Sequence, residues 1–116
     1  MAKILCIDDE SDASQVRRRL LESEGYQVVD ARTGEEGLRL FRSHKIDLVI
    51  VDYWMTGMNG LAVAREIKKL NSAVPIIVLS GLAELPGEAI GIADRWIIKG
   101  GSTQDLLNAI ASLVRR

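Results

Sequence analysis

A continuous apolar segment that runs directly into a carboxylate lies near the middle of the chain, where residues 48–51 read Leu-Val-Ile-Val and Asp52 follows. An unbroken, largely β-branched run of this length is typical of a strand that is covered on both faces, as in a parallel sheet. Residues 53–60 contain two glycines and an asparagine, so we expect a loop there. Asp52 is therefore expected at the carboxyl end of a central strand, where open α/β sheets bind their ligands.

Short apolar segments alternate with helical patterns along the whole chain. Five strands are expected, at residues 3–7, 27–31, 48–51, 76–79 and 95–98. A helix is predicted after each strand, and the fourth is a short one within residues 82–94, where Pro86, Gly87 and Gly91 weaken the helical pattern. Parallel neighbours need crossover connections, so residues 1–116 are expected to form one α/β domain, a doubly wound five-stranded parallel sheet with five helices on its two faces.

The first helix is expected to begin at Ser11 or Asp12 as its cap and to end at Gly25. Apolar residues recur in it at i, i+3, i+7 and i+8, which predicts one buried stripe. The predicted stripe consists of Ala13, Val16, Leu20 and Leu21. The three consecutive arginines at residues 17–19 are expected to form a solvated face of the same helix.

The composition excludes several classes of partner and compartment. The formal net charge of −1 gives no electrostatic case for direct contact with nucleic acid or with an anionic membrane. No segment has the length or apolar character of a signal peptide or a membrane span. Cys6 is the only cysteine, so no intramolecular disulfide can form. A cytoplasmic protein is therefore expected.

Polar functional groups follow four of the five predicted strands. They are Asp8 with Asp9, Asp52, Ser80 and Lys99. The carboxyl ends of parallel strands share one edge of the sheet, so these groups should converge. Three carboxylates with one ammonium leave negative charge uncompensated, and all-oxygen ligands favour a hard cation such as Mg²⁺. A partly hydrated metal is suited to hold a phosphoryl group, with Lys99 and Ser80 on its other oxygens and Asp52 as the nucleophile.

This ordered set of residues resembles the receiver domains of bacterial two-component response regulators, and the resemblance covers the whole chain. It implies a flavodoxin-like, CheY-like fold with strand order 2-1-3-4-5. It also implies that Asp9 binds Mg²⁺ directly, that Asp8 acts mainly through water, and that the backbone carbonyl of Trp54 is a further ligand. In such domains the residue that matches Asp52 takes a phosphoryl group from a phosphohistidine.

The same resemblance implies a histidine kinase or a histidine phosphotransfer protein as one partner and a downstream effector protein as another. Ser80 and Trp96 would form the switch, since the hydroxyl moves toward the phosphoryl group and the aromatic side chain turns inward. The family usually has proline where Thr56 and Gly100 stand, and tyrosine or phenylalanine where Trp96 stands.

The expected function is that of a stand-alone phosphoacceptor rather than an enzyme, with self-phosphorylation and autodephosphorylation as its only chemistry. One alternative is a degenerate receiver that binds partners without phosphate. An aspartate-nucleophile phosphatase is disfavoured, because Trp54 stands where such enzymes carry a second acid. A flavodoxin-like nucleotide binder is disfavoured because the loop after the first strand is acidic rather than rich in glycine.

Overall fold

The computed structural model describes residues 1–81 and 87–114. The strands are β1 (Lys3–Ile7), β2 (Gln27–Ala31), β3 (Leu48–Asp52), β4 (Ile76–Ser80) and β5 (Arg95–Ile98). The helices are α1 (Ser11–Ser23), α2 (Gly34–Ser43), α3 (Gly60–Leu70) and α4 (Thr103–Val114), with one 3₁₀ turn, η1 (Gly87–Ala89). None of the helices in these described ranges is long and apolar enough to cross a membrane.

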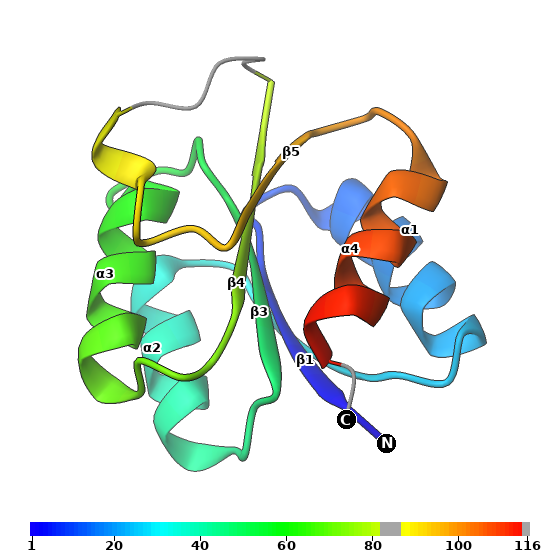
Figure 1. Ribbon diagram of the computed structural model, residues 1–116, viewed down its shortest axis with the longest axis horizontal. Coiled ribbons are helices and arrows are strands. Elements are labelled where there is room, and N and C mark those ends of the chain that lie inside the picture. Colours follow the sequence, from blue (N-terminus) through cyan, green and yellow to red (C-terminus); the bar gives the residue numbers. More distant parts are fainter. Residues whose placement is uncertain (82–86, 115–116) are drawn as a thin grey trace.

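The five strands form one parallel sheet in the order β2-β1-β3-β4-β5, which confirms the predicted architecture and strand order. Helices α2 and α3 cover one face of the sheet, and α1 and α4 cover the other (Figure 1). All strands run the same way, so their carboxyl ends lie along a single edge.

The predicted count of five helices is wrong for the part of the chain that the structure describes, which contains four. Between β4 and β5 the described residues form only the 3₁₀ turn η1, and residues 82–86, part of the predicted fourth helix, lie outside the described ranges. Gly91 adopts φ +85°, a left-handed conformation that ends a helical turn. A helix therefore cannot continue from η1 toward β5.

Side chains alternate between the two faces along each strand, so the core has two halves. The half beneath α2 and α3 takes Leu5, Ile7, Val49, Val51, Ile76 and Val78 from the sheet. The half beneath α1 and α4 takes Ile4, Cys6, Leu48, Ile50, Ile77 and Leu79. Burial on both faces explains why the strands read as unbroken apolar runs rather than as alternating ones.

Helix α1 presents a different side to the sheet from the predicted one. Its buried residues are Ser14, Arg17 and Leu21, whereas Val16 is 67% exposed. The predicted apolar stripe is therefore wrong for Val16, whereas Leu21 is buried as predicted and Ala13 and Leu20 are half-buried. The predicted solvated arginine face is wrong for Arg17 as well, and the reason is its ion pair with Asp8, described below.

The helix caps were predicted with mixed success. Glu10, rather than Ser11 or Asp12, occupies the N-cap position of α1, and its side chain makes no capping hydrogen bond. Gly25 adopts φ +92° just after α1, as a residue that terminates a helix does. The Thr33 side chain accepts a hydrogen bond from the Glu36 N–H and caps α2.

Candidate functional site

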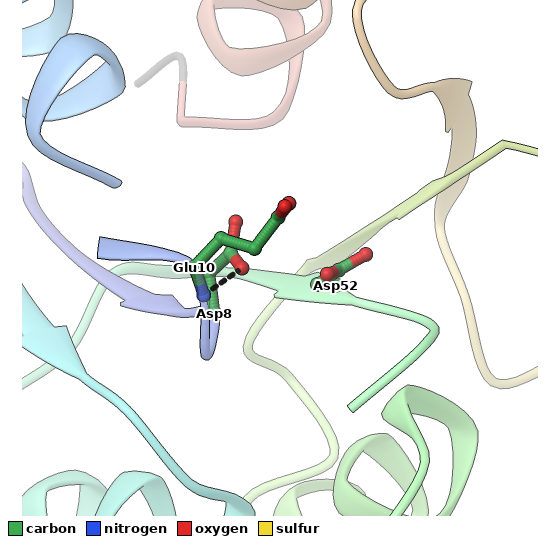
Figure 2. Close-up of side chains that lie close together, drawn as sticks. All are labelled: Asp8, Glu10 and Asp52. Atoms are coloured by element: carbon green, nitrogen blue, oxygen red, sulfur yellow. Dashed lines mark hydrogen bonds between the residues drawn. The ribbon is translucent and has the colours of Figure 1, made fainter. Parts of the chain in front are cut away.

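Three carboxylates meet at the carboxyl edge of the sheet. Asp8 follows β1 and Asp52 ends β3, and alternation along these strands directs both side chains to the α1 and α4 side. Figure 2 shows them with Glu10, the third member. Oxygens of the three carboxylates lie within 4.8 Å of one another. The sequence analysis did not select Glu10, although it directly follows the acidic pair.

The Lys99 ammonium lies among these three carboxylates. Its Nζ is 2.8 Å from Asp52 Oδ2, 2.6 Å from Glu10 Oε1 and 3.3 Å from Asp8 Oδ2. Lys99 directly follows β5, so the structure brings the ends of three strands together as the sequence predicted. One ammonium thus contacts all three negative charges.

A second cation, which the sequence analysis missed, comes from helix α1. The Arg17 guanidinium donates from both terminal nitrogens to Asp8 Oδ2, at 3.2 Å each. Asp8 is fully buried and Arg17 is 9% exposed. The charge deficit of the predicted carboxylate cluster was the available signal, because a buried negative charge needs a counter-ion. Arg17 supplies that charge one turn and a half into α1.

Asp9 is held apart from the three clustered carboxylates. Its Oδ2 accepts hydrogen bonds from the backbone N–H of Thr56 at 3.1 Å and from the Thr56 hydroxyl at 3.4 Å. A proline at residue 56 would lack that N–H and could not make the first bond. In this chain, therefore, the loop after β3 ties down the second acidic residue through Thr56.

An open pocket of about 500 Å³ adjoins the cluster. Its lining consists of Asp9, Glu10, Asp52, Trp54, Gly81 and Lys99. Trp54 is 62% exposed and places an indole, with no ionisable group, at the mouth of this pocket. Asp52 itself is only 4% exposed, so the pocket gives access to a largely buried carboxylate.

The two predicted switch residues lie toward the other half of the core. Ser80 is fully buried, and its carbonyl accepts the Lys99 N–H at 2.7 Å. Alternation along β4 directs Ser80 to the face that carries Val78, beneath α3. Trp96 packs on that same half, with its ring centroid 5.4 Å from that of Tyr53.

The backbone after Lys99 differs from what a proline would impose. No cis peptide bond occurs among the described residues, which include Lys99 and Gly100. Gly100 adopts φ +80°, a value closed to proline, whose ring holds φ near about −65°. Glycine at this position therefore fits a left-handed turn that leads from β5 toward α4.

Burial and the neighbouring charges change the pKa values of the central pair. Burial raises the pKa of Asp52, the nearby Asp8 charge adds to the rise, and the hydrogen bond from Lys99 opposes it. For Lys99, burial alone would lower the pKa, but hydrogen bonds to Asp52 and Glu10 outweigh it and raise the pKa above its usual value. Lys99 therefore stays positively charged at neutral pH.

The donor set fits a hard divalent cation. Carboxylate oxygens are the ligands that Mg²⁺ prefers, and it usually takes one or two carboxylates and keeps several waters. Asp8 and Asp52 are buried, Glu10 is exposed, and the pocket beside them is open enough to hold water. These residues are therefore suited to hold Mg²⁺.

Comparison with known sequences connects this arrangement to a family. The sequence profile of the response regulator receiver domain matches residues 4–111. The probable transcriptional regulator ycf27 of Cyanidium caldarium is 37% identical over 116 residues, which cover 97% of this chain and 46% of that protein. This chain thus spans about half the length of the curated relatives it matches.

Solved structures are similar over nearly the whole chain. A receiver domain protein of Clostridium thermocellum is 38% identical, with a TM-score of 0.91 over 100% of this chain and 96% of that one. TrrA of Thermotoga maritima, solved with Mg²⁺ and BeF, is 34% identical, with a TM-score of 0.91 over 97% of this chain and 99% of that one. TrrA has also been solved in complex with the histidine kinase ThkA. Together with the profile match, these similarities show that the chain belongs to the response regulator receiver domain family.

Proposed function

We propose that this receiver domain accepts a phosphoryl group on Asp52 from the phosphohistidine of a partner kinase, in a reaction that depends on Mg²⁺. The observation that carries the proposal is the environment of Asp52. Its carboxylate lies at the end of a central strand, pairs with Lys99 at 2.8 Å and borders an open pocket. A nucleophile that is nearly buried, yet reached through a pocket beside a fixed positive charge, is suited to phosphoryl transfer.

The proposed reaction is a direct transfer. An oxygen of the Asp52 carboxylate attacks the phosphorus atom, the P–N bond to the donor imidazole breaks, and the bonding electron pair stays on the ring nitrogen. The Lys99 ammonium, which already contacts Asp52, neutralises charge on a phosphoryl oxygen. Bound Mg²⁺ would supply further neutralisation of the phosphoryl oxygens. The residues that would hold it are Asp8, Asp9 and Asp52 with the backbone carbonyl of Trp54, and Glu10 is a further oxygen donor beside them.

Signalling would proceed from Asp52 through Ser80 to Trp96. Both residues lie toward the same half of the core, and the backbone of Ser80 bonds to that of Lys99. In this proposal the Ser80 hydroxyl donates to the new phosphoryl group, and Trp96 repacks against Tyr53. That change would alter the surface around β5 that an effector protein recognises.

The partners of similar proteins support this function. The complex of TrrA with ThkA supports a histidine kinase, or a histidine phosphotransfer protein, as the phosphoryl donor. Relatives described as probable transcriptional regulators support an effector that acts after the receiver domain. The reaction would take place in the cytoplasm, where the lone Cys6 would stay reduced.

Turnover of external phosphate esters is not part of the proposal. Hydrolysis of such an ester needs a general acid for the leaving group, and Trp54, which lines the pocket two residues after Asp52, has no ionisable group. We infer that the chemistry of this domain is confined to gaining and losing its own phosphoryl group.

Intact-mass measurement after incubation with Mg²⁺ and acetyl phosphate tests the proposal. One added phosphoryl group is expected on the unaltered protein, and none on Asp52→Asn or in a sample with excess chelator. If no adduct forms and no Mg²⁺-dependent binding of beryllium fluoride is detected, the proposal fails and a phosphate-independent interaction module takes its place.

A further inference from the structure

Arg17 is the one cation that reaches the acidic cluster from a helix among the contacts described. It extends from the sheet-facing side of α1, and both terminal guanidinium nitrogens bond to the same oxygen, Asp8 Oδ2. The other oxygen, Asp8 Oδ1, accepts the backbone N–H of Glu10 at 2.9 Å. The Asp8 carboxylate is thereby fixed on both sides, by the backbone of its own strand end and by α1.

A purely structural role, in which an ion pair attaches α1 to the sheet, already has a candidate in the adjacent residue. Arg18 donates to Asp30 Oδ2 on β2 at 2.8 Å and to Glu22 at 3.1 Å. Arg18 is 42% exposed, and neither of its partners belongs to the carboxylate cluster. Arg17 differs because it is buried and because its partner is a candidate metal ligand.

The positive charge of Arg17 is expected to affect the binding of a metal ion at Asp8. The three clustered carboxylates carry three formal negative charges, and the formal positive charges of Lys99 and Arg17 offset two of them. Asp8 Oδ2 already contacts both cations, Arg17 at 3.2 Å and Lys99 at 3.3 Å. A divalent cation that approaches Asp8 therefore meets positive charge that α1 has placed there.

We propose that Arg17 is a positioning residue of the phosphoacceptor site, which holds Asp8 in place without metal and weakens the affinity of the site for Mg²⁺. The inference rests on the proposed function, because it concerns the metal that the phosphoryl transfer needs. Arg17 thereby sets the Mg²⁺ concentration at which the site becomes loaded.

Titration calorimetry of the metal-free protein with MgCl₂, at constant ionic strength, tests the proposal. Arg17→Met removes the charge while filling similar volume, and we expect its Kd for Mg²⁺ to fall by about fivefold relative to the unaltered protein, as expected for one like charge a few ångströms from a partly hydrated site. Arg17→Lys keeps the charge, and its Kd should stay within about twofold. Arg18→Met, the matched control, removes a neighbouring arginine that contacts none of the clustered carboxylates, so its Kd should also stay within about twofold.

Equal Mg²⁺ affinity for Arg17→Met and Arg18→Met would overturn the inference, because a structural anchor alone would not distinguish them. Circular dichroism confirms that each variant is folded. If Arg17→Met does not fold, Arg17→Gln is the neutral replacement, with the same expected tightening and the same contradictory result. Failure of the proposed function looks different. If the unaltered protein binds no Mg²⁺, the proposed function fails. If Arg17→Met or Arg17→Gln also binds none, the inference about Arg17 fails too.

Discussion

Helices α3 and α1 pack on the same sheet, yet different forces hold them. The buried side chains of α3 are all apolar, and they comprise Leu61, Val63, Ala64 and Ile67. Those of α1 include a serine and an arginine, each bonded to a carboxylate. The buried surface of α3 is therefore apolar throughout, whereas α1 combines the buried Leu21 with polar contacts to Asp8 and Asp30. The helix that borders the functional site thus buries polar side chains beside its apolar one.

The burial of Arg17 also affects the surface of α1. Arg17 faces the sheet, and Val16 of the predicted stripe is 67% exposed, whereas Leu21 stays buried. Residues of α1, β5 and α4 line a cavity of about 410 Å³ between the two helices. Arg17 and Lys99 both belong to its lining, so this cavity and the acidic cluster share two cations.

The largest expected effect on the free energy of unfolding comes from a substitution at Gly60, the first residue of α3. A Cβ on Gly60 would lie 2.5 Å from the backbone oxygen of Asp52, so α3 can approach β3 only through a glycine. We expect Gly60→Ala to lower the free energy of unfolding by about 3 kcal/mol, at the upper end for overpacking. Urea unfolding measures it. Gly81→Ala is the control, because no described residue beyond its chain neighbours comes within 4 Å of its Cβ position. An equal loss in both variants would contradict this account.

One pair of identical substitutions compares the two helices directly. Val63 on α3 is fully buried, and Val63→Ala should lower the free energy of unfolding by about 2 kcal/mol. Val16 on α1 is mostly exposed, so Val16→Ala should change it by less than about 0.5 kcal/mol. Urea unfolding of both variants decides the matter. A large loss for Val16→Ala would restore the apolar stripe that the sequence predicts for α1.

The sequence predicted most of the fold because most of the fold rests on apolar periodicity. The β1, β2 and β5 strands have their predicted bounds, and β3 and β4 each extend one residue further, to Asp52 and Ser80. In α3 and α4, apolar residues at helical spacing are buried, such as Ile67 and Ile110. The stretch between β4 and β5 was harder, because its glycines and proline give no periodic signal.

The site was predictable to the extent that it sits on strand ends. Asp8, Asp52 and Lys99 meet because parallel strands share an edge, which alternation of strands and helices already implies. Arg17 and Thr56 were not found, because each acts through a partner that lies on another part of the fold and that no periodic pattern connects to it. Apolar periodicity predicts that an arginine is exposed, and it cannot show that Asp8 lies beside Arg17 in the folded chain. The proposed roles of the site residues remain predictions.

Asp52 should give the α1 side a pH dependence that the α3 side lacks. Burial raises its pKa in the folded protein, so the folded chain holds that proton more tightly than the unfolded chain. The stability that protonated Asp52 contributes is present in acid. It is lost as the pH rises from the pKa of the unfolded chain, about 3.9, through the raised pKa of the folded chain. Asp52→Asn lacks this loss, so its stability relative to the unaltered protein should increase from about pH 3 to pH 7.

Urea unfolding with chelator present, at several pH values, measures that difference. Val63→Ala, on the opposite half of the core, should show the same loss of stability at each pH. A constant difference between Asp52→Asn and the unaltered protein across this range would argue against a raised pKa at Asp52.

The smallest expected effect concerns how α1 opens. Cys6 lies 1% exposed on the α1 side of β1, and burial raises the pKa of its thiol to about 12, so a thiol reagent reacts only after that side opens. The pairs Arg17–Asp8 and Arg18–Asp30 help hold α1, and salt weakens the more exposed one. Raising NaCl from about 0.05 M to about 0.5 M should therefore speed Cys6 labelling by about twofold.

The matched probe is Val63→Cys in a Cys6→Ala background, which reports opening of the α3 side. Apolar contacts dominate on that side, and the ion pair Lys68–Asp94 is the contact there that salt can screen, so high salt should speed its labelling less than that of Cys6. Equal acceleration of both thiols would mean that global unfolding, rather than detachment of α1, exposes Cys6. In that case the attachment of α1 to the sheet would be no more sensitive to salt than the attachment of α3.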